Sequence, residues 1–154
     1  LYVTLEKLRF KDKIMVNFDI DESIYTDEVS LPPLLIQPII ENAFKHAFLH
    51  KKGNGRLNIQ FFIENDLLKC RITDDGIGRK KTAAMKSWKD KKHQSAGLST
   101  TIERLKIWFR NQNTNHQISN QELFTIIDVE NEAGEALGTQ VEMTLNTYSI
   151  DEFE

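Results

Sequence analysis

Three polar residues spaced for one face of a helix are the first candidates for chemistry in this sequence. Residues 31–49, LPPLLIQPIIENAFKHAFL, carry apolar side chains three and four apart, which is the period of an amphipathic helix. Asn42, Lys45 and His46 fall on the apolar side of that period. Burying an amide, an ammonium and an imidazole without partners is costly, so the protein or a ligand must supply partners. Taken alone, the stretch is better explained by a helix whose polar residues mark the edge of its buried face.

A glycine-rich segment, Asp74-Asp75-Gly76-Ile77-Gly78, directly follows the predicted strand 67–73. Glycines there allow a sharp turn and the close approach of a flat or bulky ligand. A carboxylate at the end of the strand can accept a hydrogen bond from an exocyclic amine. A tight turn after a strand explains the same residues at least as well.

Two further segments have the composition of binding loops. We expect Gly97 to begin a helix that ends near residues 111–115, with Ser95 as a candidate cap. The free N–H groups and the positive dipole end of a helix start suit phosphate. Gly138-Thr139 is expected to open the last strand. An ordinary helix start and an ordinary hairpin turn account equally well for these two segments.

Hydrophobic periodicity predicts the elements that must position these residues. Pro38 fits the first turn of the central helix if that helix begins near Leu35, and kinks it if the helix begins at Pro33. We interpret the lysine-rich residues 79–96 as a loop with a helical turn near 83–88. The other predicted elements are helices at 1–10 and 31–49 and strands at 14–20, 56–64, 67–73, 123–129 and 140–145. The strands 56–64 and 67–73 are expected to form a hairpin around the turn Asn65-Asp66. Helices next to hairpin-connected strands predict an α+β two-layer sandwich, because two strand connections are too short for parallel crossovers.

Composition narrows the class of protein. A chain of 154 residues fits one domain, and a net charge of −3 without a dominant basic face argues against nucleic acid. Cys70 is the one cysteine, which excludes a disulfide framework and indicates a buried, inert thiol in a reducing compartment. No apolar run is long enough to span a bilayer. The chain begins without Met and in mid-pattern, so we expect it to be a piece of a longer protein.

Together these segments match the N, G1, G2 and G3 boxes of a known family in order and spacing. In chain order they are Asn42-x-x-Lys45-His46, Asp74-x-Gly76-x-Gly78, Gly97-Leu98 ahead of Glu103-Arg104-Leu105, and Gly138-Thr139. The chain resembles the ATP-binding catalytic domain of LytS-like sensor histidine kinases over essentially its whole length. The resemblance implies the Bergerat (GHKL) fold, a two-layer α/β sandwich whose mixed, mostly antiparallel sheet is covered by helices on one face.

The resemblance also implies a role for each box. Asn42 would coordinate Mg²⁺ bound to the triphosphate, and Lys45 would contact phosphate, so both would serve the transfer itself. Asp74 would accept a hydrogen bond from the adenine amino group, and residues 79–96 would form the ATP lid. The other implied nucleotide contacts are His46 beside the nucleotide, Gly76, Ile77 and Gly78 around the ring, Gly97 and Leu98 at the end of the lid, and Thr139 at the adenine end.

The family's organisation suggests what surrounds this domain. Residues 1–12 would be the tail of a dimerisation and phosphoacceptor helical region, and 13–148 the catalytic domain. We expect ATP or ADP, the helical domain of the same parent and a downstream response regulator as partners. The parent is expected to be a homodimer anchored in a bacterial inner membrane, with this domain on the cytoplasmic side. No histidine falls on the family's phosphoacceptor pattern, so we expect the fragment to be incomplete as a kinase.

Two further departures from the family pattern, at Pro38 and on the phosphate side, bear on the alternatives to a kinase domain. Pro38 stands where ATP-hydrolysing relatives place a catalytic Glu, which disfavours a chaperone-type or repair-type ATPase. Ser95 and Thr100 replace a common glycine and a common asparagine on the phosphate side. The alternative to a kinase domain is therefore a degenerate nucleotide-binding interaction module of the same fold, without phosphotransfer.

Overall fold

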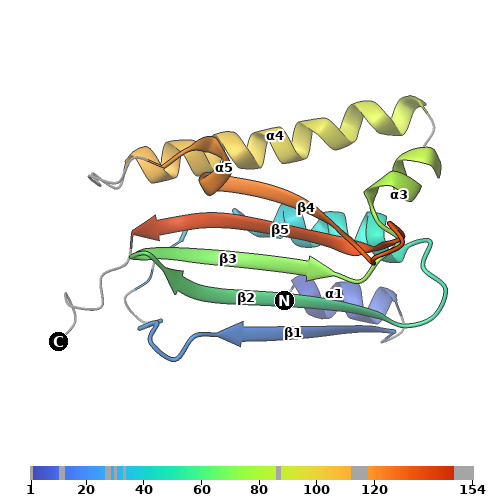
Figure 1. The fold of residues 1–154 in the computed structure, drawn as a ribbon, viewed down its shortest axis with the longest axis horizontal. Coiled ribbons are helices and arrows are strands. Elements are labelled where there is room, and N and C mark those ends of the chain that lie inside the picture. The colour runs from blue at the N-terminus through green and yellow to red at the C-terminus, as the bar shows by residue number, and fades with distance from the viewer. Residues whose placement is uncertain are drawn as a thin grey trace.

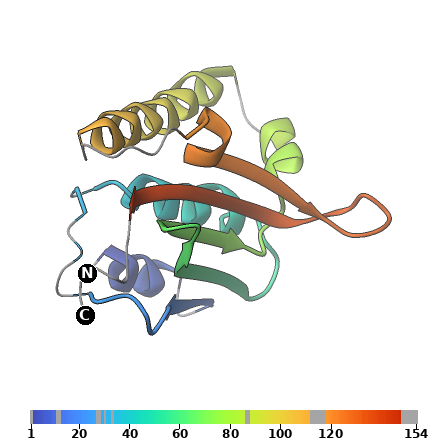
Figure 2. The same cartoon turned by 60° about the vertical axis from the view of Figure 1, so that its left-hand side comes forward.

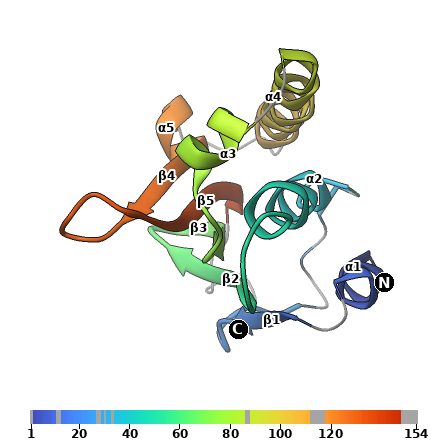
Figure 3. The ribbon, with the colours of Figure 1, turned by 90° about the vertical axis from the view of Figure 1, so that its right-hand side faces the viewer.

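A mixed sheet forms one layer of the molecule and most of its helices form the other (Figures 1 and 3). The computed structural model describes residues 2–10, 13–26, 29, 31–32, 34–85, 88–111 and 118–147, with the backbone alone for 83, 85 and 88–97. The helices are α1 (Tyr2–Arg9), α2 (Gln37–Asn42), the π-helix η1 (Ala43–Phe48), α3 (Arg79–Met85), α4 (Trp88–Arg110) and α5 (Asn120–Leu123). The strands are β1 (Ile14–Ile20), β2 (Gly55–Glu64), β3 (Leu67–Asp74), β4 (Phe124–Glu130) and β5 (Ala136–Thr147).

The five strands within the described residues lie in the order β1-β2-β3-β5-β4. β1 and β2 are parallel, and the three other neighbouring pairs are antiparallel. The prediction of a mixed, mostly antiparallel sheet is therefore confirmed. The predicted β2–β3 hairpin is also confirmed, and its turn residues Asn65 and Asp66 have φ of 53° and 58°. Asn and Asp tolerate this left-handed conformation better than most residues, which is why they suit a two-residue hairpin turn.

One face of the sheet carries the hydrophobic core. Cross-strand pairing places Cys70 of β3 between Phe61 of β2 and Met143 of β5, and the thiol is buried. The helices pack on this face, as Figure 3 shows end-on. Phe44 of η1 is fully buried, with its ring centroid 5.6 Å from that of Phe10. Apolar side chains alternating along the strands thus direct one face of the sheet to the helices.

The opposite face of the sheet is polar. Asn17 donates to Asn58 over 2.9 Å across β1 and β2, and Arg71 pairs with Glu142 over 2.8 Å across β3 and β5. Cross-strand polar pairs of this kind can stay hydrated and satisfied without a covering layer. Their alternation with the apolar residues explains why helices cover one face of the sheet.

The central helix is shorter at its start than predicted. It begins at Gln37, so Pro38 lies in its first turn, where the missing N–H is harmless, and residues 31–36 precede it. This agrees with the first of the two starts considered for Pro38. From Ala43 to Phe48 the backbone is a π-helix, which closes its hydrogen bonds over five residues.

The interpretation of residues 79–96 as a loop is wrong. α3 begins at Arg79, and α4 already runs from Trp88, so Gly97 lies inside a helix and Ser95 does not cap one. Alanine and lysine are good helix formers even where no apolar stripe is present, and they outweigh the cost of about 1 kcal/mol for an interior glycine. Residues 86 and 87 of the expected lid lie outside the described residues.

The last two strands are preceded by a short helix that was not predicted. α5 has a capping box, in which Ser119 Oγ accepts from Glu122 N and the Glu122 carboxylate accepts from Ser119 N. The S-x-x-E pattern is a sequence signature of a helix start and could have revealed it. β5 begins at Ala136, before Gly138, and the β4–β5 hairpin projects past its neighbours (Figure 2). Within the described ranges, none of the helices combines the length and hydropathy that a membrane span requires.

Candidate functional site

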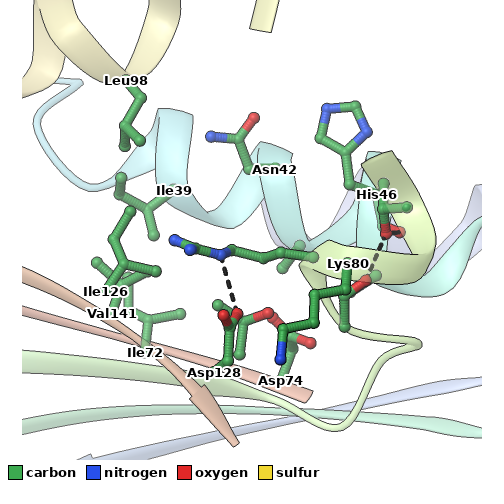
Figure 4. Close-up of a pocket in the computed structure, with 16 residues that line it drawn as sticks. Ile39, Asn42, His46, Ile72, Asp74, Lys80, Leu98, Ile126, Asp128 and Val141 are labelled. Carbon is green, nitrogen blue, oxygen red and sulfur yellow. Dashed lines mark hydrogen bonds and ion pairs between the residues drawn. The ribbon is translucent and has the colours of Figure 1, made fainter. Parts of the chain in front are cut away.

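A cavity of about 540 Å³ lies between the sheet and the helical layer (Figure 4). The strands β3, β4 and β5 form one side, and α2, η1, α3 and α4 form the other. This volume falls in the range of roughly 300–1,000 Å³ that is common for small-molecule sites.

Two rows of side chains cross the strands on the sheet side of the cavity. Residues directly opposite each other in neighbouring strands share a face. Ile72, Val141 and Ile126 form an apolar row in this way. Asp74, Thr139 and Asp128 form a polar row beside it. An apolar surface with carboxylates along one edge suits a flat ligand that carries hydrogen-bond donors on its rim.

Asp74 is the buried carboxylate of the polar row, with 9% of its surface exposed. Its Oδ1 accepts a hydrogen bond of 2.9 Å from Gly76 N. Burial raises the pKa of Asp74 to about 6, although the backbone N–H groups of Gly76 and Thr139 oppose the shift. At neutral pH the cavity therefore contains a largely ionised acceptor that water solvates poorly.

Asn42 and His46 line the helical side of the cavity, across from the sheet (Figure 4). They come from α2 and η1 respectively, and Ile39 and Ala43 line the cavity beside them. Within the described part of the chain, the Asn42 side-chain amide has no hydrogen-bond partner. An amide that lines a cavity without a protein partner is available to water or a ligand.

The π-helix supplies carbonyl groups that hold the other walls of the cavity. Ala47 O accepts from Ile77 N over 3.3 Å, which fastens the glycine-rich segment to η1. The buried Thr82 hydroxyl of α3 lies 3.1 Å from His46 O and 2.9 Å from Gly78 O. Because a π-helix redirects its backbone hydrogen bonds, η1 can bind neighbouring segments without losing its own structure.

Glycine is required in this region by the packing of the chain on itself. A Cβ at Gly76 would lie 2.2 Å from the Cβ of Ala47, and one at Gly138 would lie 1.8 Å from Asp74 O. Gly78 has a φ of 79°, and a Cβ there would lie 2.5 Å from that of Ala136. These contacts are independent of the ring clearance that the resemblance implied for Gly76 and Gly78.

Two ion pairs connect the start of α3 to β4 at the cavity. Arg79 Nε lies 2.9 Å from Asp128 Oδ1, and Lys80 Nζ lies 2.7 Å from Glu130 Oε1. Asp128 Oδ1 is buried and has no partner with hydrogen-bond geometry in the described chain, so its contact with Arg79 is an ion pair by distance alone. α3 is thus held both to η1, through Thr82, and to the sheet.

The cavity brings together six of the predicted site residues. They are Asn42, His46, Asp74, Gly78, Leu98 and Thr139. Gly76 and Ile77 are not among the described residues that line it, although both hold the adjoining segment in place. The backbone of Gly97 lies in α4, directly before Leu98.

Lys45 was expected on the buried face of the central helix, and this is wrong. Its side chain is half-exposed and pairs with Glu41 over 2.9 Å. The π-helix explains the difference, because hydrogen bonds closed over five residues no longer place positions 42 and 45 on one face. Its expected contact with phosphate stays a prediction.

Some lining residues were not singled out from the sequence. The polar ones are Arg79, Lys80, Thr82 and Asp128, and the first three fell inside the segment interpreted as a loop. Asp128 could have been found, because it lies two residues after Ile126 on a predicted strand and so shares its face. Placing it opposite Thr139 required the register of β4 and β5.

Comparison with known proteins gives relatives by sequence. No family model matches the chain. Over 104 residues it is 34% identical to the sensor protein LytS of Staphylococcus saprophyticus, covering 68% of this chain and 17% of that protein. It is 31% identical to LytS of Streptococcus mutans over the same length and with the same coverages. The chain thus spans 17% of the length of these two curated relatives.

Solved structures share the fold at lower identity. The histidine kinase domain of the blue-light activated histidine kinase from Erythrobacter litoralis EL346 matches with a TM-score of 0.54 and 16% identity. This match covers 92% of the present chain and 56% of that one. The mycobacterial sensor histidine kinase MprB matches with a TM-score of 0.51 and 14% identity, covering 94% and 89%. The predicted α+β sandwich is confirmed by these matches.

Proposed function

Because the chain belongs to the family of ATP-binding catalytic domains of LytS-like sensor histidine kinases, we propose that its cavity binds Mg-ATP. We further propose that it presents the γ-phosphate to a histidine on a helical domain of the same parent protein. The response regulator, the dimeric state of the parent and its membrane anchoring are parts of the same proposal.

The buried carboxylate of Asp74 is the observation that carries the nucleotide proposal. In our proposal it accepts a hydrogen bond from the adenine amino group, while the ring lies on the apolar row of Ile72, Val141 and Ile126. A ligand without a hydrogen-bond donor at this position would leave the buried carboxylate unpaired. Because an unpaired buried polar group is costly, such a ligand should bind much more weakly than one with the donor. Thr139, between the two carboxylates of the polar row, is proposed to complete the adenine end.

The proposed phosphate end lies at Asn42. Its amide oxygen, which has no hydrogen-bond partner among the described residues, is the kind of hard ligand that Mg²⁺ accepts, and Mg²⁺ commonly keeps waters and bridges phosphates. No cluster of three or more His, Cys, Asp or Glu in the described chain could hold a metal alone, which fits a metal carried in by the nucleotide. When bound, the metal would neutralise phosphate charge. Lys45 is proposed to exchange Glu41 for phosphate, and His46 to line the nucleotide.

Calorimetric titration with ADP and with a non-hydrolysable ATP analogue tests the proposal. We expect saturable binding by the unmodified chain, strengthened by Mg²⁺. Asp74→Asn should weaken binding at least about tenfold, because the amide offers a donor where the adenine amine needs an acceptor. Asn42→Ala should keep adenosine binding and lose the Mg²⁺ dependence of ADP binding. A folded chain that binds neither nucleotide would refute the proposal.

A second function, nucleotide binding without phosphotransfer, is favoured by one observation. α4 is continuous through Gly97, so the helix start expected to meet the phosphates is not at that position. The two functions differ in transfer to histidine. Incubation with labelled ATP and the histidine-bearing helical domain of a LytS relative should label that domain if the chain is a kinase module, and should leave it unlabelled if it is a binding module.

A further inference from the structure

Arg79, the first residue of α3, is a cation on the cavity wall for which the family resemblance implies no role beyond membership of the lid. Its Nε lies 2.9 Å from Asp128 Oδ1, and its side chain is 52% exposed. Among the residues that the structure describes, Asp128 is its one ion-pair partner. A guanidinium has five N–H donors in a flat fork, so the two terminal amino groups remain for water or a ligand.

The position of Asp128 determines which end of the cavity Arg79 faces. Asp128 is opposite Thr139 in the β4–β5 register, and Thr139 is opposite Asp74 in the β3–β5 register. The two carboxylates are therefore the ends of one row, with Thr139 between them, and Figure 4 shows both on the sheet side. Asn42 lies across the cavity on the helical side. Through Asp128, the guanidinium is thus tethered to the polar row on the sheet side, the row that also contains Asp74.

We propose that Arg79 contacts the base and ribose end of the bound nucleotide, and that Asp128 positions it there. This inference rests on the nucleotide site proposed above and adds a ligand-contacting residue and a positioning residue to it. The flat guanidinium stacks on aromatic rings and donates to ring nitrogens or hydroxyl groups. The Asp128 carboxylate restricts the side chain to this position, so less of its freedom is lost when the ligand binds.

A lysine in place of Arg79 would keep the charge and lose the flat fork. It could still pair with Asp128, but it would offer a point charge in place of a stacking surface with directed donors. Arg79→Lys therefore distinguishes the effect of the positive charge from the effect of the flat guanidinium. A residue that served only to pair with Asp128 would tolerate the replacement.

Titrations with adenosine and with ADP test the inference, because adenosine lacks the phosphates. Arg79→Met should weaken both ligands by a similar factor of about five, as expected for about 1 kcal/mol of cation–π and hydrogen-bond contact. Arg79→Lys should recover little of this loss. Asp128→Asn should weaken both ligands by about twofold, Asp128→Glu should restore them, and the double variant Arg79→Met/Asp128→Asn should match Arg79→Met alone.

A matched arginine provides the control. Arg9 of α1 is 56% exposed and pairs with Glu6 over 3.3 Å, away from the cavity, so Arg9→Met should leave both affinities unchanged. Unchanged adenosine binding in Arg79→Met would overturn the inference, and a loss confined to ADP would assign Arg79 to the phosphates instead. If the folded, unmodified chain bound neither ligand, the proposed function would fail and this inference with it.

Discussion

We expect Asp74 to lower the stability of the fold and to favour ligand binding. Burial raises its pKa from 3.8 to about 6, because the ionised form is poorly solvated in the cavity wall. The folded state therefore holds the Asp74 proton more tightly than the unfolded state does. Below about pH 3.8 Asp74 does not lower the free energy of unfolding. Between about pH 3.8 and 6 the destabilisation grows, and above about pH 6 it is fully present.

Replacing this carboxylate should stabilise the fold. A shift of this size corresponds to roughly 3 kcal/mol at most, so Asp74→Asn should raise the free energy of unfolding at pH 8 by a part of that amount. The gain should shrink as the pH falls toward 5. Urea unfolding at both pH values measures it, with the exposed Asp19→Asn as control. A loss of stability at pH 8 would mean that the carboxylate's hydrogen bonds outweigh its desolvation.

Ligand binding should depend on the same ionisation. A carboxylate accepts a hydrogen bond from the adenine amine better when ionised, so adenosine should bind more tightly as the pH rises through about 6. Adenosine is the better probe because its binding involves no phosphate that titrates. Calorimetry across pH 5 to 8 gives the profile. His46→Gln should keep the inflection, and its disappearance there would assign the titration to His46.

At the scale of elements, the contact between η1 and the glycine-rich segment determines the shape of the cavity. Ala47 O accepts from Ile77 N, and Gly76 packs where a side chain would overlap Ala47. The Thr82 hydroxyl of α3 donates a hydrogen bond to His46 O and so attaches α3 to the same π-helix. The cavity wall formed by α3 therefore depends on backbone contacts that a change of one methyl group can disturb.

Gly76→Ala should destabilise the fold by about 2–3 kcal/mol, because its Cβ would overlap the backbone and side chain of Ala47. Urea unfolding measures the loss. Gly134→Ala is the control: a Cβ there meets nothing within 4 Å, and its φ of 75° limits the cost to about 1–2 kcal/mol of backbone strain. Equal losses for the two variants would argue against a packing role for Gly76.

The sequence predicts elements well where a repeating pattern exists. The alternation in β1, β2 and β3 and the turn Asn65-Asp66 gave strands within a residue or two of those observed. The segment 79–96 has no apolar stripe, so its helices depend on propensity alone and were missed. The π-helix leaves no signal in a three- and four-residue period, which is why the direction of Lys45 was predicted wrongly and that of Asn42 correctly.

At the scale of the molecule, the two-layer arrangement followed from short connections and alternating faces. The order of the strands in the sheet could not be predicted from the sequence. β3 and β5 pair across more than sixty residues of intervening chain, and no local pattern identifies the partner strand. The polar row of Asp74, Thr139 and Asp128 exists only through that pairing. Box motifs could thus indicate Asp74 and Thr139 separately, while placing Asp128 opposite Thr139 and Arg79 beside Asp128 required the assembled sheet.

Cys70 should report the unfolding of the whole molecule. It is fully buried, and burial raises the pKa of its thiol to about 12, so the folded chain lacks both the access and the thiolate that reaction requires. A chromogenic disulfide reagent at pH 8 should therefore react far more slowly with the native chain than with the urea-unfolded chain. Destabilising variants such as Gly76→Ala should react faster, and rapid reaction of the native chain would show local opening of β3.

Because the Cys70 thiol should react slowly in the folded chain, the unmodified sequence is suitable for attaching a spectroscopic label to an introduced cysteine. A cysteine introduced on the solvent side of α3, for example at Lys81, could carry a fluorophore without removing any existing residue from the core. Distances from such a label to a nucleotide analogue would then follow α3 while ligand enters the cavity. The signal would then come from the introduced cysteine, because the one cysteine of the sequence is buried between the sheet and the helices.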